Sequence, residues 1–122
     1  MARGFTSGKA VITSGGNLKA RYVIHTVGPV WRGGNYGEPK LLAEAYRNSL
    51  KLAVLKGLRT IAFPSISTGA YGYPIEKASR IAVSVVKDFL MREDKLEKVV
   101  FVLFSSHDLE IYKEAVKEIF NI

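Results

Sequence analysis

The fold is decided by one stretch near the middle of the chain, Phe63-Pro64-Ser65-Ile66-Ser67-Thr68-Gly69-Ala70-Tyr71-Gly72-Tyr73-Pro74. Just before the loop, residues 60–63 are apolar and partly β-branched, which predicts a short strand covered on both faces. Pro74 is typical of the first turn of a helix, where its missing N–H costs nothing. The stretch therefore predicts a loop between a buried strand and a helix.

The glycines of this loop suit it for binding an anion. Gly69 and Gly72 can take backbone angles that are closed to other residues, and they place no Cβ in the way of a ligand. The N–H groups of residues 67–72 can then converge on a phosphate beside the helix N-terminus, and Tyr71 offers a flat face for a sugar or a base. A purely structural turn would explain the same glycines, because the spacing matches neither the P-loop nor the dinucleotide motif.

The amino-acid composition limits the class of protein and the kinds of site that the chain can form. The chain has 122 residues, 48% of them hydrophobic, which predicts one globular domain over residues 1–122. It contains no cysteine, which excludes disulfides, thiolate metal sites and cysteine nucleophiles. His25 and His107 are far apart and lack ligand spacing, so we expect no metal and no cofactor.

The charge of the chain favours anionic ligands without identifying them. The formal net charge is +7, and the basic residues are spread along the sequence rather than clustered. Solvated helix faces explain this spread, and a nucleic-acid-binding surface is the alternative. The apolar run at residues 99–104 is too short to span a bilayer, and residues 1–4 lack the apolar core of a signal peptide, so we expect a cytoplasmic protein with no membrane partner.

Strand and helix patterns alternate along the rest of the chain. Strands are predicted at 9–13, 21–27 and 98–104, and helices from Pro39 to about 56, from Ile75, and from a cap at Ser106. The turn at residues 14–17 makes the first two strands a hairpin candidate, and Gly57 stands where a helix C-cap is needed.

The order of these elements predicts the fold class. A helix separates the strands at 60–63 and 98–104, so a right-handed crossover would place both strands in one sheet. We expect an α/β protein with three α-β-α layers around a mixed sheet. Ligands of such sheets bind beyond the carboxyl ends of the strands, where residues 28–29, 65–72 and 104–106 would form one crevice.

The sequence resembles the macro domain family. The resemblance lies in residues 23–29, in the helix end at 50–56 and above all in residues 63–74, and it extends from about Gly8 onward. Macro domains bind ADP-ribose, and many remove ADP-ribosyl or acetyl groups attached to it. The resemblance implies a pyrophosphate held by the backbone of residues 67–72, a distal ribose against Tyr71 and an adenine stacked on Phe104. The implied ligand-binding residues are Ser67, Thr68, Gly69, Ala70, Tyr71, Gly72 and Phe104.

The chain also departs from the family pattern. Macro domains begin with further strands and a helix, which carry an acidic residue for the adenine amino group and an Asn-Ala-Ala-Asn segment beside the distal ribose. Neither feature is in this sequence, because its aspartates, Asp88, Asp94 and Asp108, occupy no equivalent place. We therefore expect the last two-thirds of a macro domain, shortened at the N-terminus, with the catalytic residues unassigned. Such a chain would expose a sheet edge, which predicts self-association, a partner that supplies the missing part, or reduced stability.

Three hypotheses about function follow from the sequence. The leading one is binding of ADP-ribose, or of an ADP-ribosylated or O-acetylated derivative, through a phosphate-cradling loop. Hydrolysis of the ADP-ribosyl or acetyl linkage stays open. The alternatives are a basic nucleic-acid-binding domain and an assembly module, without a small ligand, whose exposed edge pairs with another chain or with a second copy.

Overall fold

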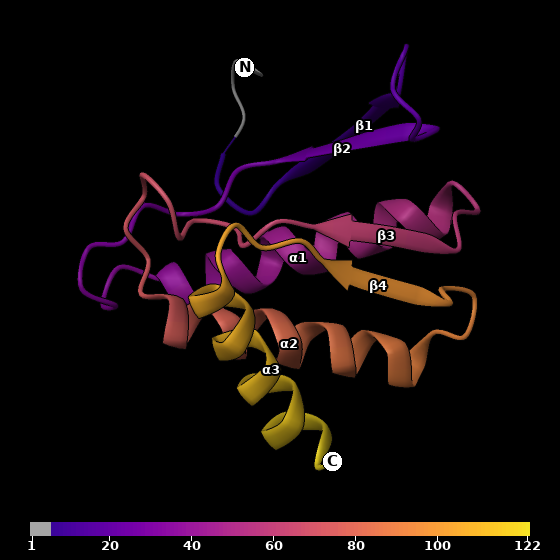
Figure 1. The fold of residues 1–122 in the computed structure, drawn as a ribbon. Coiled ribbons are helices and arrows are strands. Elements are labelled where there is room, and N and C mark those ends of the chain that lie inside the picture. Colours follow the sequence, from indigo (N-terminus) through magenta and orange to yellow (C-terminus); the bar gives the residue numbers. More distant parts are fainter. Residues whose placement is uncertain (1–5) are drawn as a thin grey trace.

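The computed structural model of the protein describes residues 6–122, so the N-terminal stretch at 1–4 lies outside the described residues. The elements, shown in Figure 1, are β1 (Ala10–Ser14), β2 (Tyr22–Thr26), α1 (Glu38–Leu55), β3 (Thr60–Phe63), α2 (Ile75–Arg92), β4 (Lys98–Phe101) and α3 (Ser106–Phe120). The predicted α/β class is confirmed. No helix within residues 6–122 combines the length and apolar character needed to cross a membrane.

The strands form two separate two-stranded sheets. β1 and β2 make the predicted antiparallel hairpin, in which Ala10 lies opposite Thr26 and Ser14 lies opposite Tyr22. β3 and β4 are parallel, with Thr60 opposite Lys98. Because parallel neighbours need a crossover, α2 provides the connection between them.

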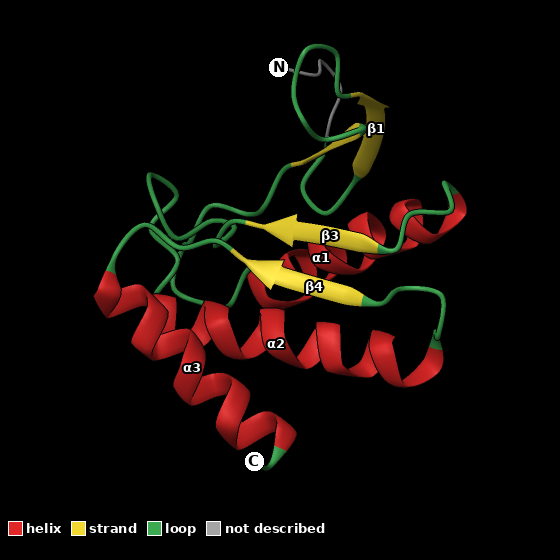
Figure 2. Cartoon of the chain, turned by 45° about the vertical axis from the view of Figure 1, so that its right-hand side comes forward, coloured by secondary structure: helices red, strands yellow, loops and turns green. Residues whose placement is uncertain are grey.

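The core lies between α1 and the elements around it. α1 contacts β1, β2 and β3 as well as α2, and α3 packs on α2 (Figures 1 and 2). The ring of Tyr46 on α1 lies 4.9 Å from that of Phe63 and 6.2 Å from that of Phe101. Fully burying an apolar side chain contributes about 1.5–3 kcal/mol, so this cluster joins α1 to the parallel pair. The most buried apolar side chains of the helices are Leu42, Ala45, Tyr46, Leu50, Ala53, Ala78, Ala82, Val83, Tyr112 and Ala115.

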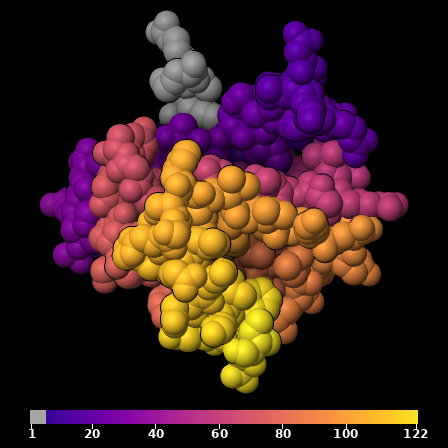
Figure 3. All heavy atoms as spheres, in the orientation of Figure 1, coloured from indigo at the N-terminus to yellow at the C-terminus, as the bar shows by residue number. Residues whose placement is uncertain are grey.

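The described chain covers β3 and β4 on one face only. Phe63 is buried beneath the helices, whereas Ala62 and Val100 on the opposite face are exposed. In Figure 3 these segments, magenta and orange, reach the surface between the indigo hairpin and the yellow end of α3. The prediction that residues 60–63 are covered on both faces is therefore wrong for this chain, because its helices pack against the Phe63 side.

The boundaries of two elements in the structure differ from those predicted from the sequence. β4 ends at Phe101 rather than at Phe104, because its partner β3 ends at Phe63 and the last bond between the two segments runs from the Val102 N–H to the Phe63 carbonyl oxygen at 2.8 Å. The cap of α3 is Ser105 rather than Ser106: the Ser105 Oγ accepts a hydrogen bond of 3.1 Å from the Asp108 N–H.

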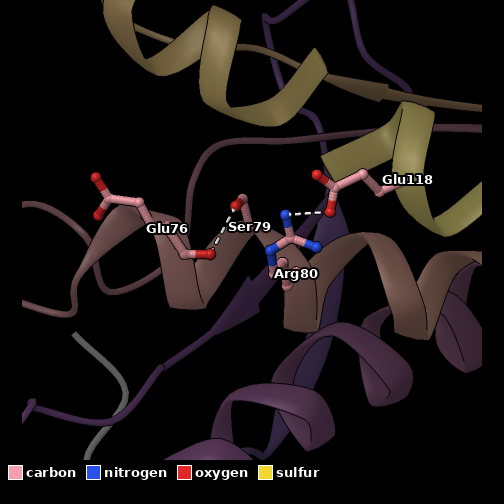
Figure 4. A network of polar contacts seen from close by, with 4 residues as sticks. All are labelled: Glu76, Ser79, Arg80 and Glu118. Carbon is pink, nitrogen blue, oxygen red and sulfur yellow. Dashed lines mark hydrogen bonds and ion pairs between the residues drawn. The ribbon is translucent and has the colours of Figure 1, made fainter. Parts of the chain in front are cut away.

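Polar contacts between α2 and α3 add little to their packing. Arg80 on α2 forms an ion pair with Glu118 on α3, next to a bond of 3.1 Å within α2 from the Ser79 hydroxyl to the Glu76 carbonyl oxygen (Figure 4). The Lys87 ammonium group of α2 donates to the Ile119 carbonyl oxygen of α3 at 2.8 Å. Arg80 and Glu118 are about half exposed, so the ion pair is worth only about 0–1 kcal/mol. Apolar burial therefore contributes more than this ion pair to the packing of the two helices.

Gly57 ends α1 in the predicted manner. Its φ is 73°, its N–H donates to the Val54 carbonyl oxygen at 2.9 Å, and the Leu58 N–H donates to the Ala53 carbonyl oxygen at 2.9 Å. These two bonds form a Schellman motif, which needs a left-handed residue at this position.

We predict that Gly57→Ala lowers the free energy of unfolding by about 1 kcal/mol, because a Cβ is strained in the left-handed region. Urea denaturation followed by circular dichroism measures the change. Gly69→Ala is the matched control: the φ of Gly69 is outside that region and an added Cβ meets no atom within 4 Å. Equal stabilities of the two variants would contradict the assignment of strain to Gly57.

Candidate functional site

The loop between β3 and α2 is folded back on itself. The Gly72 N–H donates to the Gly69 carbonyl oxygen at 3.0 Å, and the Tyr73 N–H donates to the Ser67 carbonyl oxygen at 2.9 Å. The Thr68 hydroxyl adds a bond of 3.1 Å to the Ser65 carbonyl oxygen. These bonds give residues 67–72 a fixed, compact turn.

The same turn leaves a run of backbone donors without acceptors. Among the described residues, no atom accepts a hydrogen bond from the N–H groups of residues 67–71. We refer to these five N–H groups as the cradle. Consecutive free N–H groups in such a turn are the usual backbone arrangement for holding an anion.

Ser67 is the unusual residue of the cradle. Its φ is 69°, a left-handed conformation that few residues other than glycine adopt, and its Oγ is buried without a partner among the described residues. A buried hydroxyl group without a partner typically costs about 1–3 kcal/mol. Strain and an unsatisfied polar atom in one residue are features that functional sites often have.

Tyrosine hydroxyls fix the base of the loop to the core. The Tyr46 hydroxyl accepts from the Ile66 N–H at 3.0 Å and donates to the Pro64 carbonyl oxygen at 3.3 Å. The Ser65 hydroxyl lies 2.7 Å from the Tyr112 hydroxyl of α3. Burial raises the pKa of Tyr46 well above its usual value, so its hydroxyl keeps the proton that it donates. The cradle is thus held in place by α1 and α3.

The loop that follows β2 meets the cradle. The Trp31 N–H donates to the Tyr71 carbonyl oxygen at 2.9 Å, and a Cβ at Gly28 would overlap the Ser67 hydroxyl. The predicted meeting of residues 28–29 with residues 65–72 is therefore confirmed. Gly28 has to be glycine because of this close approach.

The two aromatic side chains that were predicted to contact a ligand are exposed to solvent. Tyr71, within the loop, is 41% exposed, and Phe104, three residues beyond β4, is 98% exposed. β3 and β4 are parallel, so the segment that carries Phe104 leaves the sheet at the same end as the cradle (Figure 1). Both rings are free to stack on a ligand.

Glu38, the first residue of α1, was not among the site residues predicted from the sequence. Its side chain is buried and its carboxylate accepts from the N–H groups of Arg32, Gly34 and Tyr36 at 2.8, 3.0 and 2.7 Å. It thereby fixes the glycine-rich loop at 32–36. The sequence feature that could have indicated this role of Glu38 is an acidic residue in the first turn of a helix, directly after a glycine-rich segment.

The charge of Glu38 is stabilised by these donors. Burial alone would raise its pKa, but the N–H groups of Gly34, Arg32 and Tyr36, together with its own, lower the pKa to about 2. The carboxylate therefore stays ionised well below the usual range for glutamate.

Known proteins that are similar to this chain identify its family. The family model described as the macro domain matches residues 1–82, which is more than half of the chain. The chain belongs to the macro domain family. This finding confirms the resemblance seen in the sequence.

Individual macro domains are similar over nearly the whole chain. A macro domain-containing protein of Chlorobaculum tepidum is 58% identical over 113 residues, which are 93% of this chain and 66% of that protein. An O-acetyl-ADP-ribose deacetylase of Citrobacter koseri is 52% identical over 112 residues, which are 92% of this chain and 63% of that protein. The structure of an Oceanobacillus iheyensis macrodomain with ADP superimposes with a TM-score of 0.92 at 45% identity, over 96% of this chain and 61% of that one. The chain thus spans just under two-thirds of the length of these relatives.

We predict that Glu38→Gln lowers stability at pH 7, because the amide has one acceptor oxygen in place of a carboxylate that serves three N–H groups. The lowered pKa of Glu38 adds stability above the unfolded value of 4.5, and this contribution is lost as the pH falls from 4.5 toward 2. Thermal unfolding between pH 7 and pH 2 measures both effects.

Glu114→Gln, an exposed change on α3, is the control for the loss of one carboxylate. The Glu38 variant should lose less stability than the control protein over the interval from pH 4.5 to pH 2. Parallel curves for the two variants would show that Glu38 does not carry this pH dependence.

Proposed function

We propose that this chain binds ADP-ribose, or an ADP-ribosylated or O-acetylated derivative of it, through the cradle. The observation that carries the proposal is the set of free N–H groups at residues 67–71 beside the unpartnered hydroxyl of Ser67. Such donors match the oxygens of a diphosphate, which can accept several hydrogen bonds at once.

The relatives support the choice of ligand. One is named an O-acetyl-ADP-ribose deacetylase, and the Oceanobacillus iheyensis macrodomain is a complex with ADP. In the proposed complex the diphosphate occupies the cradle, Tyr71 packs against the distal ribose and Phe104 stacks on adenine. The exposure of both rings is consistent with these roles.

Gly69 tests the proposal without disturbing the fold. A Cβ at this position meets no atom within 4 Å, so the turn accommodates a larger side chain, and Gly69 itself supplies one of the five N–H groups of the cradle. We predict that this chain binds ADP-ribose with a dissociation constant of about 1 μM, or about −8 kcal/mol, and that Gly69→Val weakens binding at least about a hundredfold. Isothermal titration calorimetry measures both constants.

The control variant is Asn17→Val, which places the same side chain on the exposed turn of the hairpin, far from the cradle (Figure 1). Its affinity should equal that of the unchanged protein. If Gly69→Val binds ADP-ribose as tightly as the unchanged protein, the cradle does not hold the ligand. If the folded, unchanged chain gives no heat of binding with ADP-ribose, the proposed function is wrong.

Nucleic-acid binding, the alternative suggested by the net charge of +7, has a different signature. Its affinity would fall steeply with salt and would be indifferent to Gly69→Val, because phosphate contacts would come from dispersed lysine and arginine side chains. Titration with a single-stranded oligonucleotide at two salt concentrations separates the two functions.

Hydrolysis is the second candidate, favoured by the name of the Citrobacter koseri relative. Glu38 is not available as a base in this chain, because its carboxylate is occupied by three N–H groups. Release of acetate from O-acetyl-ADP-ribose, followed by chromatography, tests the activity directly. Turnover that disappears in Gly69→Val would establish it, and turnover equal to that of buffer would exclude it for this chain.

A further inference from the structure

The glycine-rich loop between β2 and α1 depends on one side chain for its hydrogen bonds. One carboxylate oxygen of Glu38 accepts from the N–H groups of Arg32 and Gly34, and the other oxygen accepts from the N–H group of Tyr36. Among the described residues, no other group forms a hydrogen bond with the backbone of residues 32–36. The shape of this loop is therefore set by the carboxylate.

The loop at 32–36 lies against the side chain of Trp31. A Cβ added to Gly34 would be 3.0 Å from the Cη2 atom of the Trp31 ring, so the backbone of the loop is close to the indole. The indole also packs on Tyr73, because the centres of the two rings are 4.7 Å apart. Trp31 thus connects the loop to the end of the cradle turn.

Glu38 also lies near Tyr73. Burial, and to a smaller extent the negative charge of Glu38, raise the pKa of the Tyr73 hydroxyl. This hydroxyl has no hydrogen-bond partner among the described residues, so packing on Trp31 holds the ring. We refer to Glu38, Trp31 and Tyr73 as the Trp31 cluster. Glu38 and Tyr73 are buried and Trp31 is half-buried.

The Trp31 cluster holds the peptide group between Tyr71 and Gly72. The carbonyl oxygen of this group accepts from the Trp31 N–H at 2.9 Å, and its N–H donates to the Gly69 carbonyl oxygen at 3.0 Å. Only the second bond lies within the cradle turn. In Figures 1 and 2 the two loops lie at the same end of the molecule. Because both polar atoms of the peptide group are bonded, the position of Tyr71 depends on Trp31 as well as on the turn.

The opposite end of the cradle is fixed by a different contact. The Ile66 N–H donates to the hydroxyl of Tyr46, in the buried middle of α1. This contact does not involve the loop at 32–36. A change at Glu38 is therefore expected to loosen the Tyr71 end of the cradle and to leave the Ile66 end in place.

We propose that Glu38 is a positioning residue of the ligand site: through Trp31 it fixes the Tyr71 end of the cradle, and it thereby strengthens binding of the part of the ligand that Tyr71 contacts. This inference rests on the proposed function, in which that part is the distal ribose. The carboxylate does not contact the ligand in this arrangement, because it is buried and accepts from three N–H groups. It acts by reducing the entropy that Tyr71 loses when the ligand binds.

The affinities of the 122-residue chain for ADP-ribose and for ADP test this inference. ADP has the diphosphate and the adenosine but lacks the second ribose, the group that Tyr71 contacts. Glu38→Gln places an amide NH2 group where an oxygen now accepts a hydrogen bond, which disturbs the loop at 32–36. We expect it to weaken ADP-ribose binding about three- to tenfold, the cost of ordering one side chain, and ADP binding less than about twofold. Isothermal titration calorimetry measures the four dissociation constants.

A role of Glu38 in stability alone would give a different result. A variant that is only less completely folded binds both ligands more weakly by the same factor, because the folded fraction multiplies both affinities. If the ratio of the ADP-ribose and ADP dissociation constants is the same in Glu38→Gln as in the unchanged chain, the inference is wrong.

Hydrogen exchange without ligand tests the positioning by itself. In Glu38→Gln the Trp31 amide should exchange at least about tenfold faster, because its bond to the Tyr71 carbonyl oxygen opens more often. The Ile66 amide, which is bonded to Tyr46, should keep its rate. An unchanged rate of the Trp31 amide, or an equal acceleration of both amides, would overturn the inference.

Gly34→Ala disturbs Trp31 while the carboxylate stays in place. The φ angles of Gly33 and Gly34 are 103° and 97°, so alanine is similarly strained at both positions. A Cβ at Gly34 presses on the Trp31 ring, whereas a Cβ at Gly33 meets no atom within 4 Å. Gly34→Ala should therefore lower the affinity for ADP-ribose more than that for ADP, and Gly33→Ala is the matched control.

Trp31 is the only tryptophan of the chain, so the fluorescence emission of the two glycine variants shows whether its ring has moved. A displaced Trp31 ring in Gly34→Ala, together with the same ratio of ligand affinities as in Gly33→Ala, would contradict the role of Trp31. Circular dichroism checks that each variant is folded.

Failure of the proposed function would look different from failure of this inference. If the folded, unchanged chain binds neither ADP-ribose nor ADP, the proposed function is wrong, and so is the effect of Glu38 on the ligand. The exchange rates of the Trp31 and Ile66 amides, which need no ligand, then decide whether Glu38 fixes the Tyr71 end of the cradle.

Discussion

The hydroxyl group of Tyr46 is the contact on which the site depends. It lies on a fully buried side chain of α1, accepts from the Ile66 N–H and donates to the Pro64 carbonyl oxygen. A glycine-containing loop has high conformational entropy, and fixing each residue costs roughly 1–2 kcal/mol. The core offsets this cost at the base of the loop, so that the cradle is preformed before any ligand arrives.

Most of the secondary structure could be predicted from the sequence because its signals are local. Periodic apolar residues indicated α1 and α2, and the turn residues at 14–17 indicated the hairpin. The cradle was predicted from two glycines between a strand and a helix. Its orientation depends on tertiary contacts, such as the Ser65 to Tyr112 bond, which join residues distant in sequence.

Other features could not be predicted because they depend on what a residue packs against. Ala62 and Val100 were predicted to be buried strand residues, yet no helix within residues 6–122 covers their face. Glu38 is a carboxylate, a group that is rarely fully buried unless it is paired. Its partners are backbone groups of an irregular loop, and no sequence pattern shows where those N–H groups point.

The division of the strands into two sheets also divides the stability of the molecule. Outside itself the hairpin mainly contacts α1, and of the residues of β1 and β2 Ile24 alone packs against the apolar cluster that the helices and β3 share. A two-stranded hairpin has little stability of its own, so it forms a cooperative unit that opens at a lower free energy than the core. Residues 27–31, which link the hairpin to the site, end at the Trp31 bond to Tyr71. Through this bond and the close approach of Gly28 to Ser67, an opening of the hairpin would disturb the cradle as well.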